Sequence, residues 1–70
     1  MAQKENTTII DGNKAYEKGD YVSAENYYSS AIAINGENAI ALLNKGNALH
    51  KQGKFTEAAT FSDAAITLTN

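Results

Sequence analysis

Residues 12–31 read GNKAYEKGDYVSAENYYSSA and residues 46–65 read GNALHKQGKFTEAATFSDAA, so the chain carries a similar pattern twice, 34 residues apart. The positions that match are mostly small or apolar, whereas the polar positions between them differ. The matched pairs are Gly12 with Gly46, Asn13 with Asn47, Gly19 with Gly53, Ala24 with Ala58, Ala31 with Ala65, Ile32 with Ile66, Tyr21 with Phe55, Tyr27 with Phe61, and Ile34 with Leu68. Such repetition indicates a structural unit in which each copy meets the same packing requirement.

Each copy of the pattern predicts two helices joined by a short turn. We expect first helices over residues 5–18 and 39–52 and second helices over residues 21–34 and 55–68, which gives an all-α fold of four antiparallel helices. Within 21–34 the apolar residues recur at steps of three and four, the period of one helix face. Gly19 and Gly53 follow the first helices, where glycine favours a left-handed closing residue. Asp20 is a candidate N-cap.

Small residues predict where the two helices of a unit cross closely, because helix axes approach only where side chains are minimal. The first copy offers Gly12, Ala24 and Ala31, and the second repeats them as Gly46, Ala58 and Ala65. The aromatic residues at positions 21, 27, 55 and 61 are then expected to fill the space between the helix pairs.

This pattern resembles the tetratricopeptide repeat family, whose unit of 34 residues is a pair of helices. The resemblance extends over about residues 5–70 and implies a short right-handed α-solenoid, with a flexible N-terminus at 1–4, unit 1 at 5–38 and unit 2 at 39–70. The chain departs from the family pattern at Gly36, where the family usually has proline. It also carries Thr8 and Asp11 where large apolar residues are usual, so we expect a weakly anchored first helix.

Composition excludes several classes of function. The chain has no Cys, a formal net charge of -2 and no Arg, and its six Lys are scattered, which argues against nucleic-acid binding. With His50 as the only histidine, neither a metal site nor a catalytic set is expected, so we predict a protein that is not an enzyme and uses no cofactor. No apolar run is long enough for a signal peptide or a membrane span, and the default location is cytoplasmic.

The second unit ends without a following helix to cover its apolar face. The residues affected are Phe61, Ala65, Ile66 and Leu68. Three explanations compete: the chain is part of a longer protein, it self-associates through this face as a homodimer or larger homo-oligomer, or it is a monomer of marginal stability. Exposed apolar patches generally mark interaction surfaces.

The first helices of stacked units line a concave side, which is the expected binding groove. The candidate peptide-binding residues are Asn13, Tyr16, Asn44, Asn47, His50 and Lys51, with Asn6, Ile9 and Leu43 also on that side. An asparagine amide carries both donors and acceptors, so it suits a peptide backbone or a carboxylate. The sequence therefore favours a protein–protein interaction module or scaffold that binds a peptide segment of a partner.

The resemblance also implies a narrower alternative. Some members of the family bind the acidic C-terminal tails of heat-shock chaperones through a carboxylate clamp of lysine, arginine and asparagine residues on successive units. By position, Asn13 and Asn44 match the two asparagines, Ile9 stands in place of the first lysine, and the third unit is absent. A co-chaperone function and a self-assembly function thus remain alternatives to a general peptide-binding groove.

Overall fold

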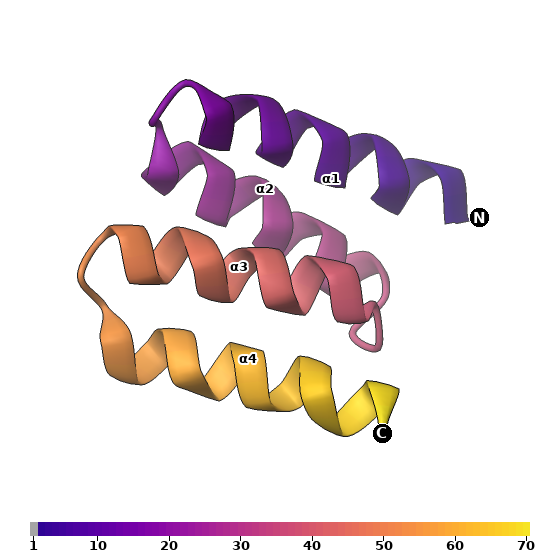
Figure 1. Ribbon diagram of the computed structural model, residues 1–70. Coiled ribbons are helices and arrows are strands. Elements are labelled where there is room, and N and C mark those ends of the chain that lie inside the picture. Colours follow the sequence, from indigo (N-terminus) through magenta and orange to yellow (C-terminus); the bar gives the residue numbers. More distant parts are fainter. Residues whose placement is uncertain (1) are drawn as a thin grey trace.

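Four α-helices follow one another along the chain, and each packs antiparallel to the next (Figure 1). The computed structural model describes the backbone of residues 2–70 and the side chains of residues 4–70. The helices are α1 (Ala2–Glu17), α2 (Tyr21–Ile34), α3 (Ala39–Lys51) and α4 (Phe55–Thr69). No strand occurs within residues 2–70, so the all-α fold with two helix-pair units is confirmed.

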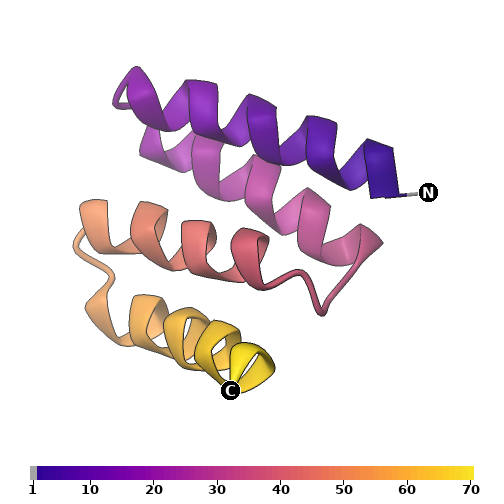
Figure 2. The ribbon, with the colours of Figure 1, turned by 45° about the vertical axis from the view of Figure 1, so that its right-hand side comes forward.

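The arrangement is a flat slab measuring 33 × 28 × 15 Å, in which α1 and α4 form the two opposite edges (Figures 1 and 2). The predicted helix ends lie close to the observed ones, except that α1 begins at Ala2 rather than at residue 5. The segment 1–4 was expected to be flexible; Met1 lies outside the described residues, and the flexibility of the segment stays a prediction.

Glycine and capping side chains close the turns. Gly19 and Gly53 both have φ of 81°, the left-handed conformation that ends each first helix. Asp20 caps α2, because its side chain accepts a hydrogen bond from Ser23 N at 3.1 Å. Asn38 caps α3, because its side chain accepts a hydrogen bond from Ala41 N at 3.1 Å.

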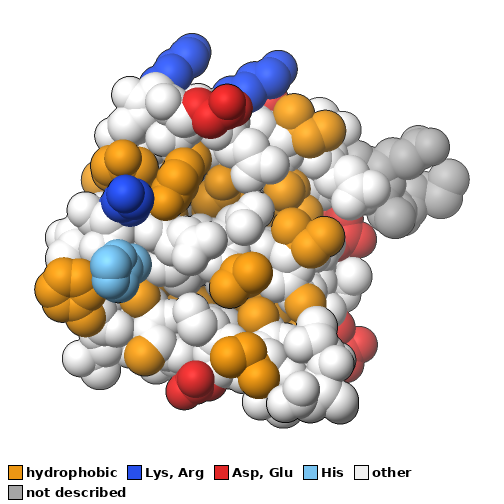
Figure 3. Space-filling view, viewed as in Figure 1, with side chains coloured by type: hydrophobic (Ala, Val, Ile, Leu, Met, Phe, Trp, Pro, Cys, Tyr) orange, Lys and Arg blue, Asp and Glu red, His pale blue; other side chains and the backbone are white. Residues whose placement is uncertain are grey.

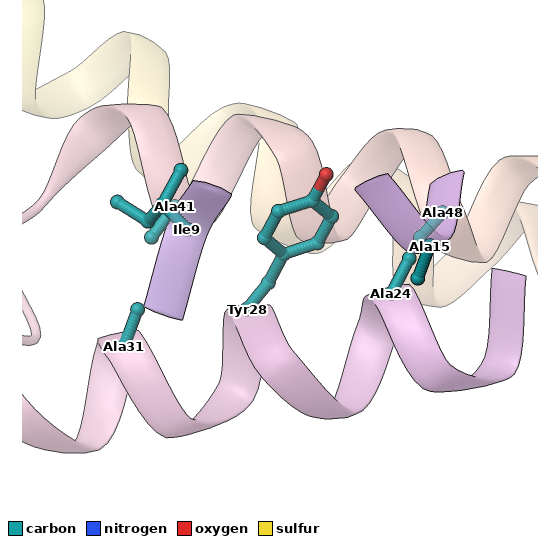
Figure 4. Packing of buried hydrophobic residues seen from close by; sticks show 7 residues of the cluster. All are labelled: Ile9, Ala15, Ala24, Tyr28, Ala31, Ala41 and Ala48. Carbon is teal, nitrogen blue, oxygen red and sulfur yellow. The ribbon is translucent and has the colours of Figure 1, made fainter. Parts of the chain in front are cut away.

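The core is built on alanines around one buried tyrosine. Tyr28 stands between two groups of buried side chains (Figure 4), and the cluster consists of Ile9, Ala15, Ala24, Tyr28, Ala31, Ala41 and Ala48. Gly12 makes this possible, because a Cβ at that position would lie 2.5 Å from Tyr28 Cε1. At the equivalent place in unit 2, a Cβ on Gly46 would lie 2.9 Å from Ser62 Oγ. The prediction of close helix crossings at these two glycines is confirmed.

The expected role of the four aromatic residues is partly wrong. Tyr27 is 42% exposed and Phe55 is 61% exposed, so neither fills the space between the helix pairs. Tyr28 takes that place, because it is the residue of α2 that faces the space left by Gly12. Tyr21 is half-buried edge-on against Tyr16, with ring centroids 5.1 Å apart.

Helix α1 is anchored more firmly than the sequence pattern indicated, through the side chains of Ile9 and Glu5. Ile9, expected on the concave side, is instead a core residue with 7% exposure. Glu5 is also buried, and its carboxylate accepts hydrogen bonds from Asn38 Nδ2 at 2.7 Å and from Asn35 Nδ2 at 3.4 Å. Thr8, which replaces a large apolar residue, donates its hydroxyl hydrogen bond to Lys4 O of its own helix at 2.9 Å.

Candidate functional site

A pocket of about 250 Å³ opens between α1 and α3. Its residues come from three helices: Asn13, Tyr16 and Glu17 from α1, Tyr28 from α2, and Asn44 and Asn47 from α3. We call it the asparagine pocket. On the face shown in Figure 3, hydrophobic side chains are visible between α1 and α3, with polar groups around them. The pocket thus has an aromatic lining and a polar rim, which is the usual composition of a site that binds an organic ligand.

Asn13 holds the centre of the pocket in one orientation. Its Oδ1 accepts a hydrogen bond from the Tyr28 hydroxyl at 2.6 Å and a second from Asn44 Nδ2 at 3.2 Å. An amide oxygen has two lone pairs, and these two hydrogen bonds use both of them. The amide nitrogen of Asn13 therefore remains available as a donor. Gly12, Asn13 and Tyr28 therefore act together, because the glycine admits the ring that fixes the amide.

Tyr28 remains a neutral hydrogen-bond donor at ordinary pH. Burial raises the pKa of its hydroxyl, and the nearby Tyr16 and Glu17 raise it further, because both would repel a phenolate. The hydroxyl proton that orients Asn13 is therefore held more firmly than that of a tyrosine fully exposed to water. This places a fixed dipole, rather than a charge, at the base of the pocket.

The pocket contains one anionic residue and no cationic one among the residues that line it. Glu17 is exposed at its edge and was not among the residues expected from the sequence. The sequence did indicate that Glu17 could join this site, because it lies four residues after Asn13, on the same helix face. Asn47 is exposed and Asn44 half-buried, so each presents an amide to solvent.

Two of the six predicted peptide-binding residues lie outside this pocket. The exposed His50 turns its ring toward Phe55 at the α3–α4 turn, edge-on with centroids 4.9 Å apart. Lys51 is exposed in the last turn of α3 and does not line the pocket. The structure thus brings together Asn13, Tyr16, Asn44 and Asn47, whereas His50 and Lys51 flank the far end of α3.

The residues expected to form a self-associating face are also divided. Ala65 is only 5% exposed, although it lines a surface groove beside the exposed Ile66, and its part in self-association stays a prediction. Phe61 is half-buried, and Lys45 Nζ lies 4.3 Å from its ring centroid. Ile66 and Leu68 are exposed, as expected.

The described side chains contain no group of three or more His, Asp or Glu residues that could hold a metal ion. Within residues 2–70, no helix has both the length and the apolar character needed to cross a membrane. The chemistry available in the asparagine pocket is therefore hydrogen bonding by neutral amides, contact with tyrosine rings, and the negative charge of Glu17.

Comparison with known proteins agrees with this architecture. The family model described as tetratricopeptide repeat matches residues 12–70. The chain is also similar to stress-induced-phosphoprotein 1 of Caenorhabditis elegans, with 35% identity over 68 residues, which cover 97% of this chain and 20% of that protein. The chain thus spans about a fifth of the length of this curated relative.

Proposed function

The chain belongs to the tetratricopeptide repeat family, and from that premise we propose that it binds an extended segment of a partner protein in the asparagine pocket and along the groove between α1 and α3. Members of this family are generally non-catalytic modules for protein–protein interaction. The observation that carries the proposal is the convergence of Asn13, Asn44 and Asn47 on one pocket beside Tyr16 and Tyr28.

The hydrogen-bonding capacity of the pocket suits a peptide backbone. Asn13 Nδ2 can donate to a backbone carbonyl oxygen, since Oδ1 of the same amide is already occupied. The Glu17 carboxylate and the Oδ1 atom of Asn44 can accept hydrogen bonds from backbone N–H groups. The Tyr16 and Tyr28 rings supply apolar contact for a side chain of the bound segment.

A carboxylate clamp for acidic C-terminal tails is the second candidate. It is favoured by the hydrogen bond of 3.2 Å between Asn13 and Asn44, which places the two clamp-like asparagines side by side. Against it, Ile9 lies in the core where the clamp lysine would stand. A second carboxylate about 4 Å from Glu17 would be disfavoured by about 1 kcal/mol in water. We therefore place neutral backbone recognition first. The similarity to stress-induced-phosphoprotein 1 is a reason to test a chaperone-related partner as well.

An NMR titration of the ¹⁵N-labelled chain separates these candidates. Three peptides of equal length serve as probes: one ending in Glu-Val-Asp with a free carboxylate, the same peptide amidated, and an amidated version with Gln and Asn in place of the acids. Neutral backbone recognition predicts shifts at Asn13, Asn44 and Asn47 with all three peptides, strongest with the third. The clamp predicts shifts with the free acid alone. Absence of shifts with every peptide would refute binding in this pocket.

A matched pair of variants tests the location of binding. Asn47→Ala removes an exposed amide of the pocket, and we expect weaker binding of the third peptide without a change of fold. Asn26→Ala removes an exposed amide on α2, outside the asparagine pocket, and should leave binding unchanged. Equal loss of binding in both variants would contradict the assigned site.

A further inference from the structure

The turn between α2 and α3, residues 35–38, begins with an asparagine that is followed directly by a glycine. Asn35 is the C-cap residue of α2, and both Asn35 and Gly36 are exposed. No other asparagine in the sequence precedes a glycine. Figures 1 and 2 show this turn at the end of the slab where α1 begins. The Asn35-Gly36 pair thus lies close to the junction of the two units.

The geometry of the turn favours attack of the Gly36 amide nitrogen on the side-chain carbonyl carbon of Asn35. Within the described residues, no hydrogen bond engages the N–H of Gly36. Glycine also has no side chain to hinder the approach. The N–H of Glu37 donates a hydrogen bond to Asn35 Oδ1 at 3.0 Å, which stabilises the negative charge that this oxygen gains during the attack.

The attack requires only a local change of the backbone. Asn35 is extended, with φ of -144° and ψ of 100°, and it lies outside α2. Rotation about its Cα–C bond breaks the hydrogen bond of 3.2 Å from Asn38 N to Asn35 O and leaves the helix intact. Asparagines within helices differ, because there the N–H of the next residue belongs to the helical hydrogen bonds. These are Asn6, Asn13, Asn26, Asn44 and Asn47.

We propose that Asn35 deamidates spontaneously and that the new carboxylate weakens the contact between the two units. Gly36 N forms a bond to Asn35 Cγ and loses its proton to water, and Nδ2 leaves as ammonia, so that a cyclic imide remains. Water then opens the imide at either carbonyl carbon and leaves aspartate or isoaspartate at position 35. The net reaction consumes water and releases ammonia, with no change of oxidation state.

The product carboxylate lies beside the buried carboxylate of Glu5. Asn35 Nδ2 donates to Glu5 Oε1 at 3.4 Å, so an aspartate at this position replaces a donor with a negatively charged oxygen. Glu5 is largely shielded from water, which leaves the repulsion poorly screened. The other partner of Glu5, Asn38 Nδ2, is neutral and does not offset it. Repulsion therefore acts on the contact that orients the first residue of α3.

Isoaspartate has a second effect, because it adds a carbon atom to the main chain. The hydrogen bond from Asn38 N to Asn35 O, which closes the turn, cannot keep its geometry along the longer path. Both products thus loosen α3 from α1 at this end of the slab. The hydrogen bond between Asn13 and Asn44 joins the same two helices, so its side-chain amide signals report the change without any ligand.

The first test asks whether the reaction occurs at this position. The purified chain is incubated for days in mildly acidic and mildly alkaline buffers, and peptide mapping by mass spectrometry locates the conversion of amide to acid. We expect aspartate and isoaspartate at position 35 before any other asparagine reacts, and sooner in alkali. Gly36→Ala, whose methyl group has room in the folded chain, should slow the conversion several-fold. Reaction elsewhere first, or an equal rate in Gly36→Ala, would overturn the proposal.

The second test measures the consequence with Asn35→Asp, which reproduces one product. We expect Tm to fall by about 4–8 °C, as for one unfavourable contact in a small domain, and the side-chain amide signals of Asn13 and Asn44 to shift. Asn26→Asp adds the same charge at an exposed position of α2 and should leave both unchanged. In a Glu5→Gln background, Asn35→Asp should lose most of its effect. Equal effects of the two aspartate variants, or an undiminished effect beside Glu5→Gln, would refute the role of Glu5.

Discussion

The Glu5 carboxylate is predicted to hold the two units together, and its removal gives the sharpest test of the packing described above. Glu5 is 6% exposed, and it lies on α1, 30 residues before Asn35 and 33 residues before Asn38. It accepts a hydrogen bond from Asn38 Nδ2 at 2.7 Å, and the Oδ1 atom of the same Asn38 caps α3. Glu5 therefore orients the residue that starts α3.

The cost of Glu5→Ala follows from these contacts. A hydrogen bond to a charged group contributes about 1.5–3 kcal/mol, and the Asn35 contact of 3.4 Å is too long to add much. We therefore expect a loss of about 2 kcal/mol, which is large for a domain of this size, where a single core rarely supplies more than about 3–5 kcal/mol. The corresponding fall in Tm is about 8–16 °C.

The assay is thermal and urea unfolding followed by circular dichroism. Glu37→Ala is the matched control, because it removes an exposed carboxylate in the α2–α3 turn and should change stability by less than about 0.5 kcal/mol. A double-mutant cycle of Glu5→Ala with Asn38→Ala should give a coupling energy of about 1 kcal/mol or more. If Glu5→Ala costs no more than Glu37→Ala, or if the cycle shows no coupling, the reasoning is refuted.

Three further predictions concern single residues. Gly12→Ala would place a Cβ 2.5 Å from Tyr28 Cε1, so urea unfolding should show a loss of about 3 kcal/mol or more, whereas Gly36→Ala, with its nearest atom at 3.7 Å, should be nearly neutral. Tyr28→Phe removes the hydrogen bond to Asn13, so we expect a loss of about 1 kcal/mol together with shifted side-chain amide signals of Asn13 in NMR spectra. Hydrogen bonds from the side chain and from the backbone N–H of Ser23 lower the carboxyl pKa of Asp20. The contribution of this carboxylate to stability is therefore present above the unfolded pKa of about 3.9 and is lost as pH falls through the folded value. The stability difference between the wild type and Asp20→Asn should therefore be constant near neutral pH and shrink below about pH 4, and a constant difference down to pH 2 would contradict this assignment.

The helices could be predicted from sequence because their signals are local. Glycines at positions 19 and 53, the Asp20 cap and the regular spacing of apolar residues fix where each helix begins and ends to within a few residues. The proximity of Asn13, Tyr16, Asn44 and Asn47 could be predicted for the same reason, since helical spacing puts them on one side of the two first helices. The 34-residue repeat then gives the first helices of the two units equivalent positions in the fold.

The features that the sequence did not predict depend on contacts between segments that are distant in sequence. Tyr27 and Tyr28 both fit the apolar pattern of α2, and only the position of Gly12 on the neighbouring helix decides which ring is buried. The bond from Asn38 to Glu5 joins residues 33 positions apart and has no local signal. His50 fits the groove face by spacing, but its ring packs on Phe55 after the chain turns.

The two units share a backbone plan and differ in the side chains that would hold the next helix. Unit 1 supplies Tyr28 in its core and the carboxylate of Glu5 at its edge, and both act on α3. At the equivalent positions unit 2 has Ser62 and Ala39, which offer less surface and no charge-assisted bond. Unit 1 thus holds α3 through a buried ring and a polar contact, and unit 2 repeats neither side chain. The repeat therefore keeps the glycines and alanines that set the distance between helices, whereas the side chains that join one unit to the next differ between the two copies.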